Sequence, residues 1–192
     1  MDEANAPLPS PPDRIELGDG AYLRLYIPDD AGMVFEAVDR DRERLRAWLP
    51  WVDATIGPGD TRAFIEATIG TAGREFAYGI FAADGFAGGI GLHIDRENRS
   101  AMIGYWIAAE HEGQGLITRS SRALTDIAFR DLGMHRVWLS ADAKNTRSRA
   151  VAERLGFQLE GVHRGDSLRG DRFRDTVIYA ILEDEWPSSR PG

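Results

Sequence analysis

The sequence predicts a single α/β domain of the α+β kind, in which helices flank a mixed, mostly antiparallel central sheet of about seven strands. Its 192 residues, 43% of them hydrophobic, suffice for one well-packed domain and are few for two. Short apolar runs bounded by turn signals alternate with amphipathic stretches of helical period. The early strand-like runs follow one another in hairpin order, whereas the later ones flank helices, which favours a mixed sheet.

The first part of the domain is expected to contain one strand and three helices. Alternation predicts the strand over residues 21–26, and Pro28-Asp29-Asp30 then supplies the start of the first helix. Further helices are predicted over 41–48 and 60–72, the latter because its apolar residues share one face.

Three antiparallel strands are expected to follow. The runs 76–82 and 87–94 are joined by Ala83-Asp84-Gly85, which is a strong hairpin signal. Asn98 marks another turn before a strand over 101–107.

The last part of the domain should alternate helices and strands. Helical spacing begins at about Leu116 and stops at Gly133, and Asn145 starts a second helix that Gly156 closes. The strands expected here cover residues 137–141, 157–162 and 176–182.

Both ends of the chain read as tails around a domain over residues 15–184. Residues 1–14 and 185–192 lack hydrophobic periodicity, and the N-terminal segment is rich in proline. The start lacks the basic and apolar regions of a signal peptide, and no later apolar run is long enough to span a bilayer. We therefore expect a cytoplasmic protein with no membrane partner.

Composition excludes several kinds of chemistry. The absence of cysteine excludes disulfides, thiolate metal sites and a cysteine nucleophile, and we expect no metal. The formal charge of -8 argues against a nucleic-acid partner, because a duplex-binding surface needs clustered cations. The same charge is compatible with a basic substrate.

A glycine turn between a strand and a helix is the first candidate ligand site. Alone, Gly113-Gln114-Gly115 could be a tight turn that needs positive φ. Because a helix begins directly after it, however, several backbone amides should converge on one point where a pyrophosphate fits. The residues concerned are Gly113, Gln114, Gly115, Leu116, Ile117 and Thr118.

A second helix start is expected to face the same ligand. Asn145 is by default a helix N-cap, and Ser148 is a hydroxyl in the first turn. The strand before them should lie parallel to the strand over 101–107, so both residues project where a ligand in the glycine turn would extend.

Two of these motifs resemble a known family. Residues 110–118, EHEGQGLIT, are similar to the acetyl-CoA pyrophosphate loop of the GNAT N-acetyltransferases, and residues 145–157, NTRSRAVAERLGF, are similar to their second cofactor motif. The runs IGYWI at 103–107 and LEG at 159–161 resemble the RimJ/RimL-like branch, which contains ribosomal-protein alanine and serine N-acetyltransferases. The resemblance extends over residues 21–182.

The resemblance implies the GNAT fold, in which the central sheet splays between the strands over 101–107 and 137–141 and acetyl-CoA enters the gap. It also implies direct transfer to an amine without a covalent enzyme intermediate. A backbone N–H at Ile107 or Ala108 would then stabilise the oxyanion. Ser148 would lie near the leaving thiolate, whereas Ala152 stands where many members have a tyrosine acid.

The residues expected on the acceptor side belong to no motif as specific as the two cofactor motifs. Asp166 is a candidate general base by its place after the LEG run, and His93 is another because its reference pKa of about 6.5 suits proton acceptance. Trp48, Trp51 and Tyr105 could line the acceptor pocket.

The function expected from the resemblance is acetyl transfer in a ternary complex to a primary amine, above all a protein N-terminal α-amine. Such an amine, with a pKa near 8, is roughly one-tenth neutral at pH 7 and needs little help from a base. Polyamine or aminoglycoside acetylation and a non-catalytic acyl-CoA-binding module are the alternatives. A dinucleotide-binding oxidoreductase with Asp142 on the ribose is remote, because Thr118 replaces the third glycine of its fingerprint. A homodimer would agree with the resemblance.

Overall fold

The computed structural model describes residues 10–71 and 73–187, which form eight strands, five α-helices and three short 3-10 turns. The strands are β1 (Arg14–Gly18), β2 (Ala21–Leu25), β3 (Glu75–Ala82), β4 (Gly85–Asp95), β5 (Ser100–Ile107), β6 (Arg136–Asp142), β7 (Gln158–Arg169) and β8 (Arg172–Leu182). The helices are α1 (Ala31–Arg40), α2 (Arg42–Leu45), α3 (Pro58–Ile69), α4 (Leu116–Arg130) and α5 (Thr146–Arg154). The 3-10 turns are η2 (Pro28–Asp30), η3 (Pro50–Asp53) and η4 (Ala109–His111).

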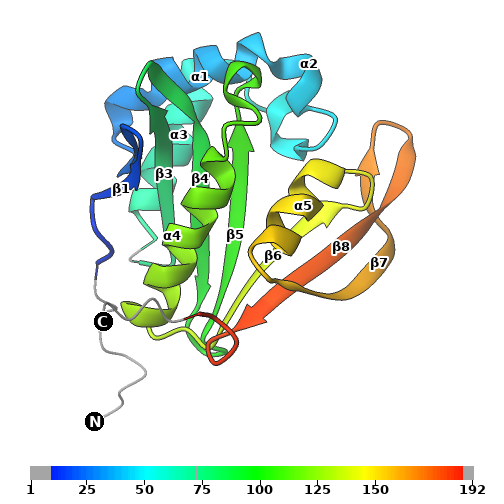
Figure 1. Cartoon of the computed structure of the whole chain (residues 1–192). Coiled ribbons are helices and arrows are strands. Elements are labelled where there is room, and N and C mark those ends of the chain that lie inside the picture. Colours follow the sequence, from blue (N-terminus) through cyan, green and yellow to red (C-terminus); the bar gives the residue numbers. More distant parts are fainter. Residues whose placement is uncertain (1–9, 72, 188–192) are drawn as a thin grey trace.

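All strands belong to one sheet, in the order β1-β2-β3-β4-β5-β6-β8-β7 (Figure 1). Neighbouring strands are antiparallel except β5 and β6, which are parallel. Helix α4 makes the crossover between these two, because parallel neighbours cannot be joined by a tight turn. The predicted mixed, mostly antiparallel sheet is confirmed.

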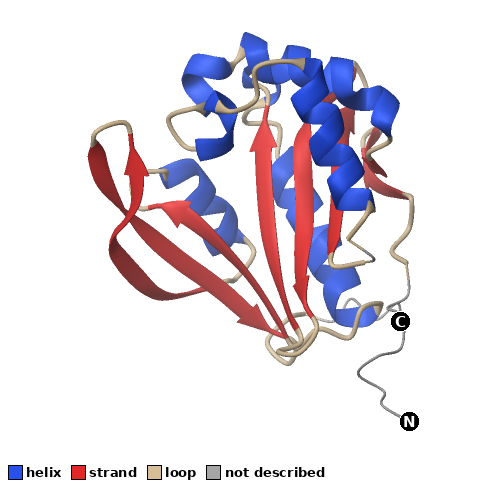
Figure 2. Cartoon of the chain, turned by 180° about the vertical axis from the view of Figure 1, so that it is seen from behind, coloured by secondary structure: helices blue, strands red, loops and turns tan. Residues whose placement is uncertain are grey.

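The helices cover the sheet unequally. Helices α4 and α5 lie on one face, and their apolar sides share the main core with the inward residues of β2 to β6 and of β8. Helices α1 and α3 lie on the other face over β3 and β4, where they enclose a smaller core that includes Val38, Val52 and Ile65. Figure 2 shows that, within the described residues, no helix covers β6, β8 and β7 on this second face.

Two parts of the sheet were not expected from the sequence. Strand β1 occupies residues that border the predicted N-terminal tail, and it pairs with β2 through Ile15↔Leu23. Strands β7 and β8 extend into a long hairpin arm that pairs out to Arg169↔Arg172. The arm carries many exposed charged residues on both faces, so it lacks the apolar alternation that predicts a strand.

The C-terminal boundary also differs from the prediction. Trp186 lies in the expected tail, yet it is buried against Phe129 and Phe157 and its indole N–H donates to Asp126 Oδ1 at 2.9 Å. One aromatic side chain thus fixes the segment after β8 to α4. The predicted end of the helix at residue 72 and the tail residues 1–9 and 188–192 lie outside the described residues.

No helix in the described part of the chain combines the length and apolar character needed to cross a membrane. Among the same residues, no group of three or more His, Asp or Glu side chains is arranged to hold a metal ion.

Candidate active site

The sheet opens between β5 and β6. The two strands pair only through Ser100↔Arg136, Ala101↔Val137 and Met102↔Trp138, and then they diverge (Figure 1). Backbone N–H groups alternate sides along a strand, and the amide of Ala108 donates to the Ala87 carbonyl of β4 at 2.8 Å. The amides of Tyr105 and Ile107 therefore point away from β4, towards the opening.

This arrangement corrects one of the two candidate oxyanion donors. The expected donor was the amide of Ile107 or of Ala108, and the Ala108 amide is already engaged with β4. Of these two candidates, Ile107, the last residue of β5, presents its amide to the gap between the strands.

The glycine turn lies at the start of α4, next to this gap. Gly113 and Gly115 have φ values of +79° and +73°, and Gly115 is the residue that precedes the helix. A Cβ at either position would meet nothing within 4 Å, so the conformation and not crowding requires glycine. The turn is thus open to a ligand, and the amides that follow it at the helix start suit an anionic group such as a pyrophosphate.

Side chains hold the turn from both directions. The Gln114 amide group donates to the Glu110 carbonyl at 3.2 Å, and Arg154 of α5 donates to Thr118 Oγ1 at 2.9 Å. Leu116 is buried and anchors the first turn of α4, while Ile117 packs against the main core. The two helices that flank the opening are therefore tied together at their sides.

The start of α5 forms the opposite wall. Asn145 is its N-cap, as predicted, and accepts a hydrogen bond from the Ser148 amide at 3.2 Å. The Tyr105 hydroxyl donates to the Ser148 carbonyl at 3.4 Å and so spans the opening from β5 to α5. Burial raises the pKa of Tyr105 to about 12, which keeps the phenol protonated at neutral pH.

Tyr105 does not lie with the predicted acceptor-side aromatics. Its ring packs against the main core, on the face of the sheet that carries α4 and α5. The next residue along β5, Trp106, points to the opposite face, where its ring lies 6.4 Å from that of Trp51 and 5.7 Å from that of Phe86. Alternation along the strand would have revealed this exchange of Tyr105 for Trp106.

A glycine in β4 makes room for the Trp106 side chain. A Cβ on Gly89 would lie 2.6 Å from Trp106 Nε1, so only glycine allows the indole to cross the neighbouring strand. Trp48, the other predicted acceptor residue, lies beneath the guanidinium of Arg174 at 5.8 Å. Arg174 also binds Asp142 Oδ2 at 3.1 Å, which places Trp48 beside the ends of β6 and β8.

The two candidate bases lie in different places. His93 pairs in register with Met102, at the closed end of the opening, and its Nδ1 lies 3.2 Å from Glu75. Five residues of strand, about 16 Å, separate this position from Ile107. The structure therefore does not bring His93 to the open end of β5, where Ile107 lies.

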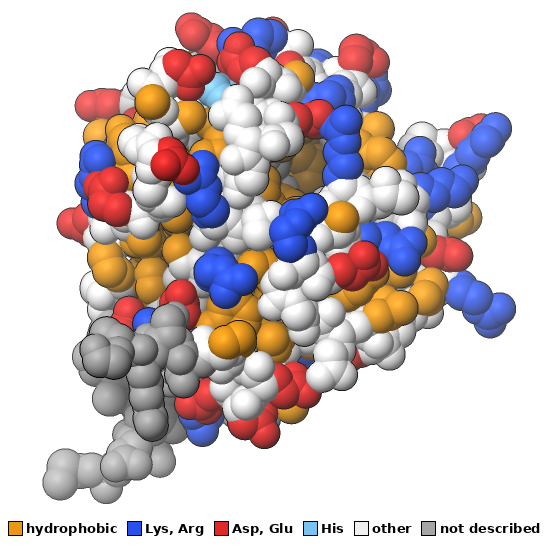
Figure 3. All heavy atoms as spheres, in the orientation of Figure 1, with side chains coloured by type: hydrophobic (Ala, Val, Ile, Leu, Met, Phe, Trp, Pro, Cys, Tyr) orange, Lys and Arg blue, Asp and Glu red, His pale blue; other side chains and the backbone are white. Residues whose placement is uncertain are grey.

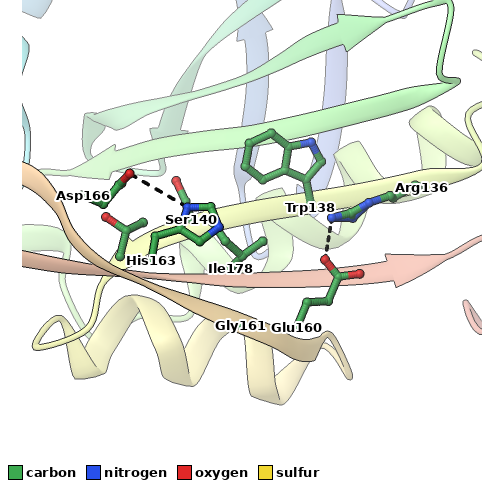
Figure 4. A pocket seen from close by; sticks show the side chains of 9 residues that line it. Arg136, Trp138, Ser140, Glu160, Gly161, His163, Asp166 and Ile178 are labelled. Carbon is green, nitrogen blue, oxygen red and sulfur yellow. Dashed lines mark hydrogen bonds and ion pairs between the residues drawn. The ribbon is translucent and has the colours of Figure 1, made fainter.

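Asp166, in contrast, lines a hollow of about 470 Å³ on the uncovered face of β6, β8 and β7 (Figure 4). Its Oδ1 lies 3.9 Å from Nδ1 of His163, which points into the same hollow. The other residues of the hollow are Arg136, Trp138, Ser140, Glu160, Gly161, Thr176 and Ile178. Sequence reasoning missed His163, and a histidine three residues before the candidate base was the available signal.

Basic side chains gather on the face that carries α4 and α5, around the opening (Figure 3). Two arginines of α4 are engaged with other parts of the fold: Arg119 binds the carbonyls of Leu17 and Gly18, and the guanidinium of Arg122 lies 5.3 Å from the Trp186 ring centre. Arg147, in the first turn of α5, forms an ion pair with Glu112 and so links the two helix starts.

A sheet that splays beside a glycine turn at a helix start, with a capped second helix opposite, defines an acyltransferase fold that binds an acyl-CoA. Residues 21–158 match the family described as acetyltransferase (GNAT) domain. The chain belongs to the GNAT family and is an N-acetyltransferase that uses acetyl-CoA.

Relatives extend the similarity over nearly their whole length. YdaF of Bacillus subtilis (strain 168), named among the ribosomal N-acetyltransferases, is 35% identical over 175 residues, which are 88% of this chain and 94% of YdaF. Ribosomal-protein-serine acetyltransferase of Escherichia coli (strain K12) is 26% identical over 173 residues, 88% of this chain and 97% of its own. The structure of RimL, a ribosomal L7/L12 α-N-protein acetyltransferase in complex with coenzyme A, superposes with a TM-score of 0.85 at 26% identity, covering 88% of this chain and 97% of RimL.

Proposed function

We propose that this enzyme transfers the acetyl group of acetyl-CoA to the α-amine of a protein N-terminus, as the ribosomal-protein N-acetyltransferases do. The observation that carries the proposal is the similarity to such enzymes over 94% and 97% of their own lengths. The uncovered face of β6, β8 and β7 supports it, because an exposed sheet face with a shallow hollow leaves room for a polypeptide.

The cofactor side of the proposed site uses mainly backbone groups. The amides of Gly113 to Thr118 would hold the pyrophosphate, with Asn145 and Ser148 on the opposite wall. The bound cofactor supplies a thioester whose carbonyl carbon accepts the amine. The Ile107 amide would donate to the oxygen that becomes negative during the attack.

Proton movement is assigned to side chains on both faces. As the C–N bond forms and the C–S bond breaks, the amine loses one proton and coenzyme A leaves as a thiolate. Asp166, with His163 at 3.9 Å, is the proposed acceptor of the first proton. The Ser148 hydroxyl is the proposed donor of a hydrogen bond to the thiolate.

The acceptor opening is assigned to Trp48, Trp51 and Trp106. Trp51 is 39% exposed and meets Trp106 edge to face, so its ring is available to a bound peptide. Trp106 takes the place that was expected for Tyr105.

A panel of acceptors tests this proposal. Release of free thiol from acetyl-CoA would be measured with peptides that carry Ser or Ala at a free N-terminus, with the same peptides blocked at the α-amine, and with polyamines and aminoglycosides. We expect turnover with the free peptides and none with the blocked ones, even when these contain lysine. Faster turnover of a polyamine or an aminoglycoside would contradict the proposal, and binding of acetyl-CoA without turnover of any acceptor would indicate a non-catalytic module.

The expectations about location and assembly stay predictions. We propose that the enzyme works in the cytoplasm, where nascent and ribosomal proteins are found, without a nucleic-acid or membrane partner. A homodimer is also proposed, and light scattering of the purified protein would measure its mass.

A further inference from the structure

We infer that Arg44 is a positioning residue for acetyl transfer, because its guanidinium fixes the end of β5 and so keeps the Ile107 amide turned towards the thioester oxygen. This inference rests on acetyl transfer at the opening between β5 and β6. It does not depend on which amine accepts the acetyl group.

Arg44 joins three segments through its two terminal nitrogens. Nη2 donates to the Ile107 carbonyl at 2.6 Å and to Asp41 Oδ2 at 2.8 Å. Nη1 donates to Glu112 Oε1 at 2.6 Å, in the segment just before the glycine turn. The side chains of Arg44, Asp41 and Glu112 are only 30%, 10% and 24% exposed, so solvent weakens these contacts little.

The Ile107 carbonyl needs such a partner because the sheet has opened beside it. Pairing with β6 ends at Met102, so the backbone groups of Ile107 that face the opening have no strand opposite them. Arg44 takes the place of that missing strand. A loss of this contact would loosen the last residue of β5 on its open side, and the Ile107 amide, in the peptide just before the carbonyl, would then be less accurately placed as the donor to the oxyanion.

Neighbouring contacts show that the whole turn after β5 is fixed residue by residue. The Ala108 amide is held by β4, and the Ala109 amide donates to Asp41 Oδ2 at 2.6 Å, the same oxygen that binds Arg44. Ile107 and Ala109 are thus tied to the α1–α2 junction, and Ala108 between them is tied to β4. Of these ties, the one at Ile107 depends entirely on Arg44.

The residue type agrees with this role. A guanidinium presents several donors in a rigid planar fork and can serve three acceptors at once, whereas a lysine ammonium is a point charge on a flexible stem. Glu112, one of the acceptors, also pairs with Arg147 of α5. The same network therefore connects the end of β5 with both walls of the cofactor site.

The test combines kinetics with the infrared band of the thioester carbonyl. Acetyl-CoA labelled with carbon-13 at the acetyl carbonyl would be bound to the wild type and to Arg44→Ala, Arg44→Lys and Arg46→Ala. Arg46 is the matched control, because it lies on the same segment and, within the described residues, its ion pairs are with the exposed side chains of Glu43 and Asp53.

We expect kcat to fall roughly tenfold to a hundredfold in Arg44→Ala, since a misplaced oxyanion donor costs somewhat less than a deleted one. The KM for acetyl-CoA should change less than about threefold, because the pyrophosphate contacts remain. The carbonyl band of the bound thioester should move to higher frequency, towards its value in free acetyl-CoA. Arg44→Lys should lie between the wild type and Arg44→Ala, and Arg46→Ala should match the wild type.

An unchanged carbonyl band together with an unchanged kcat in Arg44→Ala would overturn the inference. If Arg44→Ala does not fold, Arg44→Lys decides the question, and full wild-type kcat and band position in that variant would equally overturn it. The infrared measurement needs no acceptor, so it gives a result even if the proposed N-terminal substrate is wrong. A wrong substrate would fail the acceptor panel and leave the carbonyl band of the wild type polarised.

Discussion

Ser148 combines a structural and a proposed chemical role within one residue. Its amide is bound by the N-cap Asn145 and its carbonyl by Tyr105, and both contacts use the backbone. The hydroxyl belongs to neither contact. A substitution at Ser148 can therefore remove the proposed thiolate contact without removing the helix cap.

Replacement of Ser148 by alanine should lower kcat by about tenfold, the order expected for one charge-assisted hydrogen bond of roughly 1.5 kcal/mol. The affinity for acetyl-CoA should change less than about twofold, because the backbone contacts persist. Steady-state kinetics and calorimetry would measure the two effects, with Thr146→Ala on the same turn as the control. An unchanged kcat would contradict the proposed thiolate contact and leave Ser148 with only its structural role in the first turn of α5.

At position 115 the backbone conformation requires glycine. Because its φ of +73° lies in the left-handed region, Gly115→Ala should cost about 1 kcal/mol of folding free energy. If the turn relaxes instead, the amides at the start of α4 will no longer converge, and acetyl-CoA affinity should fall several-fold. Urea unfolding and calorimetry would distinguish these outcomes. Gly104→Ala, at another open glycine without positive φ, is the control, and equal effects at both sites would contradict this account.

At the scale of elements, the contact between the α1–α2 junction and the end of β5 is the most informative. Asp41 binds Arg44 and the Ala109 amide with a single carboxylate oxygen. Burial alone would raise the pKa of Asp41, but the hydrogen bonds from Arg44 and Ala109 outweigh it and hold the pKa below its usual value. The charged form of Asp41 is therefore the form that stabilises the fold.

The Asp41→Asn variant should be less stable than the wild type at pH 7 by about 1–3 kcal/mol, the usual cost of losing a charged partner of buried groups. Since the folded-state pKa is depressed, this contribution is fully present above the ordinary carboxyl pKa of about 4 and is lost as the pH falls below it. The difference in unfolding free energy between the two proteins should thus be constant from pH 7 to pH 5 and shrink towards pH 3. A difference that grew on acidification would contradict the assignment.

Strand β1 and the extended β7–β8 arm are the two parts of the sheet that the sequence pattern did not predict. Ile15 and Leu17 do alternate, but five residues between a proline-rich start and a Gly-Asp-Gly turn give too short a pattern to separate from a tail. In the arm, exposed Leu168 and Phe173 pair across the two strands among charged neighbours. Neither face of the arm is buried in a core, so hydrophobic periodicity could not predict the length of these two strands.

For the whole molecule, the opening between β5 and β6 divides the sheet into two halves joined by three residue pairs. Side-chain ties across the opening, such as Tyr105 to Ser148 and Glu112 to Arg147, supplement this joint. A ligand that contacts both walls should therefore stabilise the fold as a whole.

Acetyl-CoA at about one hundred times its dissociation constant should add about 2.7 kcal/mol to the unfolding free energy by mass action. For a chain of this size, that corresponds to a rise in Tm of roughly 5–11 °C, measurable by calorimetry or thermal-shift fluorescence. Coenzyme A without the acetyl group should also give a large part of the shift, because the pyrophosphate contacts are shared. The absence of any shift with either compound would contradict the assigned cofactor site.

The sequence by itself determined the features that depend on local pattern. Turn conformations and helix starts follow from neighbouring residues, so the sequence predicted the order of the central strands, the glycine turn before α4 and the Asn145 cap. The lack of cysteine is read directly from the composition and excludes thiol chemistry. The family followed from the two motifs together. Only the tertiary structure decided that Trp106 replaces Tyr105 among the acceptor-side aromatics, that His93 lies at the closed end of the opening and that Arg44 holds the end of β5. The face of Trp106 follows from alternation along β5 once the strand is placed in the sheet, whereas the position of His93 depends on the register of β4 and β5, and the contact of Arg44 joins residues that are distant in the sequence.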